Sequence, residues 1–471
     1  MSEKQTQDSS LRRSVALFNE ALRDNEEDFT KGPVRRALAL HASPKMLEMA
    51  MESIFAVVDI AFVSRLGTDA VAAVGITEAL VTVLYAVAIG LGMGLTAMVA
   101  RRIGEKDADA AALVTGQSLW IGAVLSIVIG VAGVIYAQDL LQLMGASDGV
   151  VEQGRGFTAV LLGGSASIIY LFLLNAAFRG AGDATVALRS LWLANGINIV
   201  LDPCLIFGLG PFPEMGVTGA AVATTIGRGV GVLYQLWYLL GIRGRITLRA
   251  QHLTLVPELS MRLLRISIGG IGQFLIATAS WIGVMRIVAL YGSPAIAAYT
   301  IALRMMEFTF LPAWGLGNAA ATLVGQNLGA GQPDRAAESA WQAAKYNAAF
   351  MAVAGAFMLL FASAITGLFT SEPDVLYWGT RCLQILGMGF PMYAVGMVMI
   401  QSLNGAGDTL TPAILNLICF WLVQIPLAYL LATRTALGPN GAFTAIVVSE
   451  SLLTILSVIV FRRENWKHHV A

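Results

Sequence analysis

Long apolar segments separated by short polar ones dominate this chain of 471 residues. Hydrophobic residues make up 56% of it and charged residues 13%, whereas a soluble domain has roughly 25% charged residues because its surface faces water. An apolar run of about 20 residues is long enough for a helix to cross a bilayer. The sequence therefore predicts an all-α membrane protein. Twelve spans are expected, at 44–64, 75–100, 113–137, 155–178, 187–208, 217–240, 265–290, 296–324, 342–366, 378–403, 411–432 and 441–461.

The second half of the chain repeats the first at a constant offset of 225 residues. The tetrapeptide Gly180-Ala-Gly-Asp183 recurs as Gly405-Ala-Gly-Asp408, and Gly67 and Gly216 correspond to Gly292 and Gly441. Because six spans return the chain to the side where it began, the halves are parallel repeats related by an axis along the membrane normal. We expect two six-helix bundles, an N-lobe and a C-lobe, with a cleft that opens to either side.

Lys and Arg are concentrated in the segments that lie on one side of the predicted spans. The segments on the other side hold only Arg65, Arg155, Arg381 and Arg434. Cytoplasmic loops carry the excess of basic residues, so we expect a multi-pass protein of the cell inner (plasma) membrane with both termini in the cytoplasm. The predicted organisation is a cytosolic segment with a short amphipathic helix near Leu11–Leu22 (1–43), the N-lobe (44–240), a cytosolic linker (241–264), the C-lobe (265–461) and a tail (462–471).

Ionisable and amide side chains within the spans indicate functional sites, because burying them in a membrane is costly. The repeat serves as an internal control, since positions that serve only the fold should agree between the halves. Four polar positions have apolar counterparts at the 225-residue offset. They are Asp59, Asn195, Asn198 and Asp202, opposite Val284, Phe420, Val423 and Leu427.

Two of these positions are carboxylates at similar depth. Asp59 and Asp202 each lie about six residues from the outer end of a span that runs from inside to outside. Asn195, Asn198 and Asp202 share one helical face. Carboxylates and amide oxygens in a low-dielectric pocket suit either a proton or Na⁺. These residues alone do not distinguish between the two ions. A purely structural role, capping helix ends or joining helices, is the alternative.

Further residues are candidates for other roles. Glu52 and Glu307 are candidates for a cavity that binds a cationic substrate, and Glu450 is another acid within an apolar span. Pro44 begins the first predicted span and is a candidate bend point for gating. The Gly-Ala-Gly-Asp sequences lack a Lys-Ser/Thr partner, so we interpret them as capped tight turns rather than phosphate-binding loops.

Several functional classes are not expected. Net charge is zero, with 30 basic and 30 acidic residues, which gives no indication of nucleic-acid binding. The three cysteines lie in or beside apolar runs and predict no disulfide framework or metal cluster. All four histidines lie outside the spans, and no catalytic constellation is visible, so no enzyme is predicted. We expect no cofactor apart from a coupling ion, and we expect the protein to be a monomer.

The combination of motifs resembles the MATE (multidrug and toxic compound extrusion) family across residues 44–461. The motifs are the repeated Gly-Ala-Gly-Asp, Val58-Asp59 followed by Arg65-Leu66-Gly67, and Gly90-Leu91-Gly92. The sequence Asn198-Ile-Val-Leu-Asp202-Pro203 is similar to the DinF-like prokaryotic branch. That resemblance implies a cation site at Asp59, Asn198 and Asp202, with Asn175 as a supporting amide.

The predicted function is a cation-coupled antiporter, driven by H⁺ or Na⁺, that exports amphipathic or cationic organic compounds by alternating access. Its partners are small organic substrates and the lipid bilayer. The alternative is a flippase for lipids or lipid-linked oligosaccharides of the same superfamily. A flippase typically has extra helices or a strongly basic cavity, and this chain offers few basic residues within its spans.

Overall fold

The computed structural model describes residues 20, 28–241 and 244–468 of the chain, and these are almost entirely helical. The amphipathic helix expected near Leu11–Leu22 lies outside the described residues, apart from Glu20. The chain forms two compact units. The N-terminal unit contains residues 43–267, and the C-terminal unit contains residues 28–42 together with 268–468.

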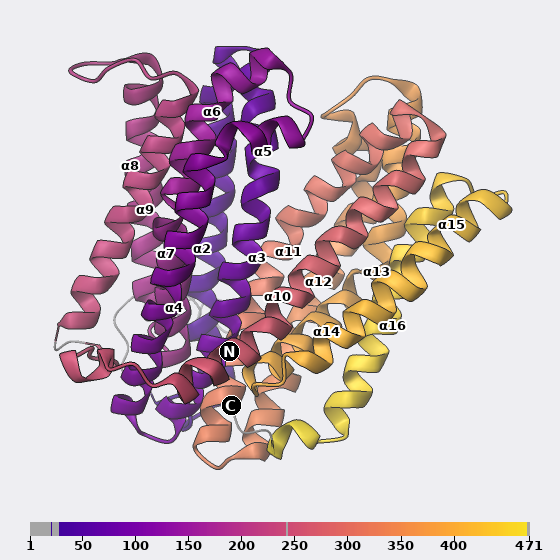
Figure 1. Cartoon of the computed structure of the whole chain (residues 1–471). Coiled ribbons are helices and arrows are strands. Elements are labelled where there is room, and N and C mark those ends of the chain that lie inside the picture. Colours follow the sequence, from indigo (N-terminus) through magenta and orange to yellow (C-terminus); the bar gives the residue numbers. More distant parts are fainter. Residues whose placement is uncertain (1–19, 21–27, 242–243, 469–471) are drawn as a thin grey trace, which may run out of the picture. The chain divides into compact units, whose positions relative to one another are not determined.

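The N-terminal unit contains the first six predicted spans (Figure 1). The fourth span is broken at Gly164 into two helices that meet at 41°. The short helix α5 (Ala137–Leu143) leads into this pair. The other elements are α2 (Val34–Val63), η1 (Ser64–Leu66), α3 (Thr68–Gly104), α4 (Ala108–Ile135), α6 (Asp148–Gly163), α7 (Ser165–Ala181), α8 (Ala184–Phe207) and α9 (Val217–Leu240).

The C-terminal unit contains the remaining six spans, one of which is irregular. Its eleventh span consists of α14 (Leu410–Asn416), the π-helix η4 (Leu417–Gln424) and α15 (Ile425–Arg434). A π-helix places one additional residue in a helical path. The other elements are α10 (Pro257–Val288), η3 (Ala289–Tyr291), α11 (Ser293–Gly329), α12 (Pro333–Gly367), α13 (Pro373–Gly405), α16 (Pro439–Arg462) and η5 (Asn465–His468).

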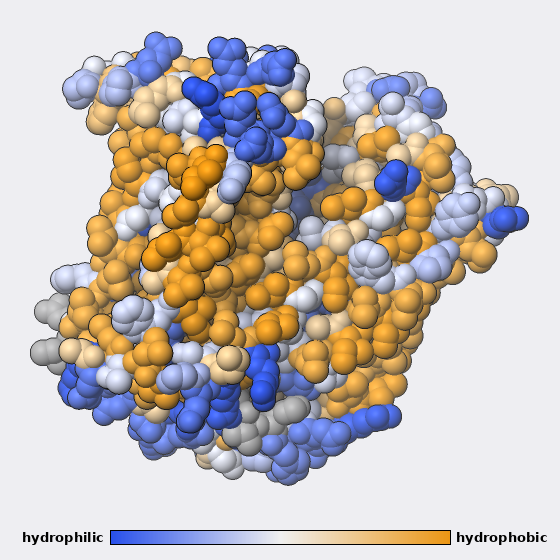
Figure 2. All heavy atoms as spheres, in the orientation of Figure 1, coloured by the Kyte–Doolittle hydropathy of each residue, from blue (hydrophilic) through white to orange (hydrophobic). Residues whose placement is uncertain are grey.

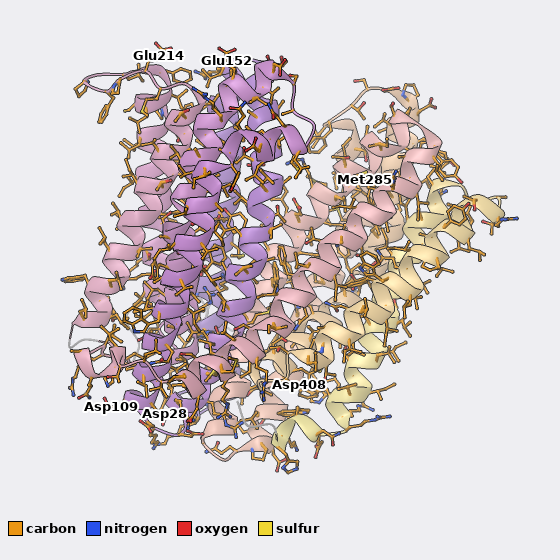
Figure 3. The ribbon with its side chains drawn as sticks, viewed as in Figure 1. Asp28, Asp109, Glu152, Glu214, Met285 and Asp408 are labelled. Atoms are coloured by element: carbon orange, nitrogen blue, oxygen red, sulfur yellow. The ribbon has the colours of Figure 1, made fainter. Side chains whose placement is uncertain are left out.

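The helices have the length and surface of membrane spans. Among the described residues, eight helices are long and apolar enough to cross a bilayer. The number is nine if the bent pair α6 and α7 counts as one span. Hydrophobic side chains cover the middle of the helices on the face shown in Figure 2, and hydrophilic ones gather at the helix ends. In the N-terminal unit, Glu152 and Glu214 lie at one end of the helices and Asp109 at the other (Figure 3). This placement agrees with the predicted alternation of the loops.

The first span begins earlier than the sequence predicts. Helix α2 starts at Val34, so Pro44 lies inside the helix rather than at its start. Residues 34–43 extend the helix because Val34, Leu38 and Leu40 are buried and supply an apolar face. A proline inside a helix removes one backbone hydrogen bond and weakens the helix there. Pro44 also lies two residues after Ala42, the last residue of α2 that belongs to the C-terminal unit.

The segment between the halves packs on the N-terminal unit. Ile246 and Leu248 belong to its hydrophobic core. The η2 turn (Ala250–Leu253) lies against α4, where Gln117 Nε2 donates to the Thr254 carbonyl oxygen at 2.8 Å. A side chain at Gly116 would have its Cβ 2.0 Å from the His252 carbonyl oxygen. The predicted linker 241–264 is thus part of a folded unit over its described residues.

The repeated Gly-Ala-Gly-Asp sequences form the expected turns. Gly182 and Gly407 have φ values of 94° and 91°, in the left-handed region that favours glycine. Asp408 Oδ1 accepts a hydrogen bond from the Thr411 backbone N–H at 3.1 Å and so caps the next helix. Asp183 pairs with Arg245, with 3.7 Å between Nε and Oδ1. Both motifs form tight turns, and only the aspartate of the second is seen to cap the following helix with its side chain.

The repeat is shifted in the last two helices of each unit. A Cβ on Gly219 would meet the Leu205 carbonyl oxygen at 2.5 Å, and one on Gly441 would meet that of Leu431 at 2.6 Å. Gly216 and Gly438 both precede these glycines with φ near 55°. Gly438 rather than Gly441 is therefore the counterpart of Gly216. Beyond the π-helix the offset is 226, and in the last helix it is 222.

This shift changes one of the sequence comparisons. Leu205 corresponds to Leu431, so Asn198, seven residues earlier, corresponds to Gln424 rather than to Val423. Asp202 corresponds to Ala428, which is apolar and buried. The prediction that all four polar positions are apolar in the second half was therefore wrong for Asn198. The absence of an acid opposite Asp202 remains.

Candidate functional site

The carboxyl groups of Asp59 and Asp202 meet inside the N-terminal unit. Asp59 lies on α2 and Asp202 on α8, and the two side chains share a hydrogen bond. Two carboxyls form such a bond only when one of them carries a proton. Oδ1 of each residue is buried and has no hydrogen-bond partner. The pair therefore presents two acceptor oxygens that no protein group satisfies.

Asn198 completes this pair as the sequence predicts. With its amide oriented to satisfy both ends, its Nδ2 donates to Asp202 Oδ2 at 2.7 Å. Its oxygen then accepts from Thr224 Oγ1 on α9 at 2.8 Å. Asn198 and Asp202 are one helical turn apart on α8, so the helix itself holds the amide beside the carboxyl. Gly227 on α9 permits this contact, because its Cβ would lie 3.2 Å from that of Asn198.

A buried arginine lies beside the pair. Arg228 on α9 is 8% exposed and interacts electrostatically with Glu52 and Asp59. Its Nη2 donates to Tyr85 Oη at 2.8 Å, and its guanidinium carbon lies 5.8 Å from the centre of the Tyr85 ring. The sequence prediction did not include Arg228. A basic residue alone within the apolar span 217–240 was the available signal.

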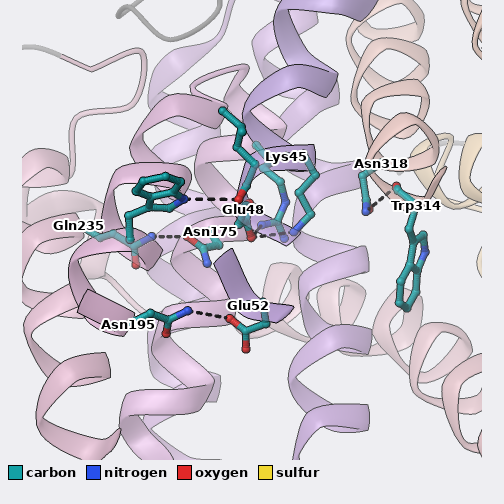
Figure 4. A network of polar contacts seen from close by, with 11 residues as sticks. Lys45, Glu48, Glu52, Asn175, Asn195, Gln235, Trp314 and Asn318 are labelled. Carbon is teal, nitrogen blue, oxygen red and sulfur yellow. Dashed lines mark hydrogen bonds and ion pairs between the residues drawn. The ribbon is translucent and has the colours of Figure 1, made fainter. Parts of the chain in front are cut away.

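The other two predicted amides bind different partners. Asn195 Nδ2 donates to Glu52 Oε2 at 3.2 Å, and Gln235 Nε2 donates to Asn175 Oδ1 at 2.5 Å (Figure 4). Neither contact includes Asp59 or Asp202. Asn195 therefore orients Glu52 instead of supporting the carboxyl pair. Asn175 joins α7 to α9 through Gln235.

A second charged group lies nearer the N-terminal end of α2 (Figure 4). Lys45 Nζ lies 2.7 Å from Glu48 Oε1, and Arg179 Nη1 lies 3.5 Å from the same oxygen. Lys45 and Glu48 are 7% and 3% exposed. A buried carboxylate that contacts two cations is electrostatically compensated. Glu48 thus belongs to an ion-paired cluster rather than to the Asp59–Asp202 pair.

The structure does not bring Glu307 to this site. Glu307 lies on α11 of the C-terminal unit, where it is exposed and interacts electrostatically with Arg304. Of the two acids predicted for a substrate cavity, Glu52 is the one that lies beside the carboxyl pair, through Arg228. The N-terminal unit therefore contains a carboxyl pair with free acceptor oxygens, a fixed guanidinium and one further acid. Such a group can exchange a proton or a hard monovalent cation.

Known proteins resemble this chain over nearly its whole length. It is 28% identical to the probable multidrug resistance protein YoeA of Bacillus subtilis, covering 93% of this chain and 95% of that one. It is 27% identical to the probable multidrug resistance protein NorM of Thermotoga maritima, covering 92% and 93%. The FAD transporter of Shewanella oneidensis is 26% identical, with coverage of 92% and 95%.

Solved structures share the fold. A transporter of the MOP superfamily from Pyrococcus furiosus, described as having a binding pocket of reverse polarity, has a TM-score of 0.87 and 26% identity. The alignment covers 94% of this chain and 98% of that one. A MATE crystal structure in a bent conformation has the same TM-score and identity, with coverage of 93% and 97%. The twelve-helix, two-lobe architecture is therefore confirmed, and these relatives are transporters rather than enzymes.

The family assignment follows from the two halves separately. The sequence model of the MatE family matches residues 44–204 and again residues 270–430. The second match begins 226 residues after the first. This equals the offset between Leu205 near the end of α8 and Leu431 near the end of α15. The chain belongs to the MatE family, the multidrug and toxic compound extrusion (MATE) transporters, and is a multi-pass membrane protein.

Proposed function

We propose that this chain is an antiporter that exports amphipathic or cationic organic compounds in exchange for H⁺ or Na⁺. The coupling cation binds at Asp59 and Asp202, with Asn198 orienting the second carboxyl. The single observation that carries the proposal is the contact between these carboxyls, each with an unpartnered buried oxygen. A cation that binds more tightly in one conformation than in the other shifts the equilibrium between them and drives alternating access.

The repeat supports a functional role for the carboxyl pair. The counterparts of Asp59 and Asp202 in the C-terminal unit are Val284 and Ala428, both fully buried and apolar. Since the same bundle folds without acids at these positions, the fold does not require them. An unneeded buried acid costs stability. The binding of an exchangeable cation would explain why Asp59 and Asp202 are present.

The relatives' names support small organic substrates. Two are named as probable multidrug resistance proteins and one as a FAD transporter. We propose that Glu52, next to Arg228, contributes to the substrate cavity of the N-terminal unit, and that Pro44 is the bend point of α2 during gating. We further propose an inner-membrane location with both termini in the cytoplasm, supported by the distribution of Lys and Arg.

Transport assays with single substitutions test the carboxyl site. Purified protein in liposomes is given a pH gradient or a Na⁺ gradient, one at a time, and movement of a cationic dye is recorded. Asp59→Asn and Asp202→Asn should each reduce ion-driven transport to the level of protein-free liposomes, because neither variant can hold the cation between two carboxyls. Asp148→Asn, which changes an exposed acid at the start of α6, is the matched control.

The same liposomes separate the alternatives. Whichever gradient drives the dye identifies the coupling ion. Wild-type transport rates in both carboxyl variants would disprove the cation site. Movement of a labelled lipid between leaflets, without gradient-driven dye transport, would instead favour the flippase.

A further inference from the structure

The C-terminal unit contains a carboxyl group that the proposed site does not use. Glu450 lies on α16, beside residues of α13 and the π-helix η4. Its carboxyl interacts electrostatically with the hydroxyl of Tyr393 on α13 and the thiol of Cys419 on η4. Both neighbours are buried, with Tyr393 3% exposed and Cys419 fully buried. Glu450 thus faces the interior of its own bundle.

The backbone holds Glu450 at this position. One turn further along α16, Thr454 Oγ1 donates to the Met392 carbonyl oxygen at 2.8 Å and to that of Glu450 at 3.0 Å. Gly396 permits this close approach, because a Cβ there would lie 2.3 Å from Thr454 Oγ1. The two contacts fix α16 against α13 next to Tyr393. The position of Glu450 beside the phenol is therefore set by helix packing.

Within the part of the chain that the structure describes, no cation compensates this carboxyl. Among the described residues, no ion pair or side-chain hydrogen bond to Glu450 is found, and its electrostatic neighbours are neutral. Two nearby polar atoms are also unpartnered and buried: Tyr393 Oη, and Nε2 of Gln424, whose Oε1 accepts from Ser449 Oγ at 2.7 Å. An isolated carboxylate in apolar surroundings is strongly unfavourable. The neutral, protonated form is the form that these surroundings accommodate.

The corrected repeat gives this site a counterpart in the N-terminal unit. At the offset of 222 established by Gly219 and Gly441, Glu450 corresponds to Arg228 and Ser449 to Gly227. Gln424 corresponds to Asn198, and in each unit the amide contacts the helix that carries the charged residue. The two units therefore use the same place for a fixed cation in one case and an uncompensated acid in the other. An acid has no structural reason to replace an arginine there.

We propose that Glu450 is a second proton-binding site, in the C-terminal unit, with the Tyr393 hydroxyl positioned to donate to its ionised form. The proton is taken up and released at Glu450 during the transport cycle. The role in transport rests on the antiport proposed above, whereas proton binding itself does not.

Infrared difference spectroscopy on the purified full-length protein tests proton binding directly. Spectra recorded between about pH 5 and pH 9 should show a band of protonated Glu450, in addition to that of the proton shared by Asp59 and Asp202. Glu450→Gln should remove the Glu450 band, while Glu307→Gln, which changes an exposed acid of the same unit, should retain it. Tyr393→Phe should move the band's midpoint to higher pH, because the ionised form loses a hydroxyl donor. An unchanged spectrum in Glu450→Gln overturns the proposal.

Two further measurements separate this proposal from the function proposed above. A double variant, Asp59→Asn with Asp202→Asn, should retain the Glu450 band even though its ion-driven transport is lost. A pH difference of one unit sustains a limiting ratio of dye concentrations across the membrane. In the single Glu450→Gln variant this ratio should fall about tenfold, because one proton fewer is exchanged for each dye molecule. Loss of the band with no change in that ratio overturns the role in transport.

Discussion

Buried charges in the N-terminal unit nearly balance one another. The acids of α2 recur at spacings of four and seven residues, which places them along one face of the helix. Each of these acids has a neighbour of opposite charge or a partner with which it shares a proton. The four carboxyls Glu48, Glu52, Asp59 and Asp202 face the three cations Lys45, Arg179 and Arg228, so one monovalent cation would neutralise the group.

Arg228→Met tests this balance. Removing the guanidinium leaves one more negative charge beside Asp59, so the coupling cation should bind more tightly. We expect half-maximal dye transport at an ion concentration lower by about tenfold, because a charge a few ångströms away contributes more than 1 kcal/mol in a protein interior. Arg155→Met, at an exposed arginine of α6, is the control. An unchanged ion dependence would contradict the assigned role of Arg228.

Close backbone contacts between helices occur at matching places in both units. A Cβ on Gly180 of α7 would lie 2.9 Å from the Thr96 carbonyl oxygen of α3, and one on Gly405 of α13 would lie 2.1 Å from that of Ala321 on α11. Glycine is needed here because the obstacle is backbone, which does not move aside as a flexible side chain does. The repeated glycines before each Gly-Asp turn therefore fix the packing of two helix pairs.

Gly405→Ala should destabilise the protein by about 2 kcal/mol, since the added methyl group forces α13 and α11 apart. The measurement is the melting temperature of the purified protein in detergent. Gly196→Ala on α8 is the matched control, because no atom lies within 4 Å of the Cβ it would add. If both variants melted at the wild-type temperature, the close contact would have no energetic importance.

Helix α2 joins the two units covalently and contributes residues to both. Its residues 34–42 group with the C-terminal unit, and residues from 43 onward, including Asp59, group with the N-terminal unit. The chain just before the helix is bound within the C-terminal unit by Arg335 of α12. The Nη2 atom donates to the carbonyl oxygens of Lys31 at 2.9 Å and Gly32 at 2.8 Å. One continuous helix therefore carries both Asp59 of the proposed cation site and the residues 34–42 that group with the C-terminal unit.

Arg335→Met should release this anchor. Losing hydrogen bonds worth about 1 kcal/mol each favours local opening, and trypsin should cleave after Lys31 and Arg35 about tenfold faster. Limited proteolysis followed by mass spectrometry identifies the cut sites. Arg463→Met, at an exposed arginine of the same unit, should leave the rate unchanged. Equal cleavage rates in both variants would show that Arg335 does not hold the segment.

The sequence by itself determined the twelve spans, the duplication and the Asp59–Asn198–Asp202 group. Span length depends on local hydrophobicity alone, and the duplication is recorded in repeated glycines that backbone contacts require. Asn198 and Asp202 lie one turn apart on a single helix, so their proximity needs no tertiary information. Asp59 was identified by its charge, depth and family resemblance, and the structure confirms its contact with Asp202.

Only the tertiary structure decided which polar groups pair across helices. Asn195 and Asn175 were predicted at the cation site, but helix rotation directs them to Glu52 and Gln235. The π-helix inserts one residue and the loop before α16 is four residues shorter than its counterpart, so a constant offset of 225 conceals that Gln424 matches Asn198 and Glu450 matches Arg228. Such pairings depend on backbone hydrogen bonding and packing between distant segments, which the order of residues along the chain does not specify.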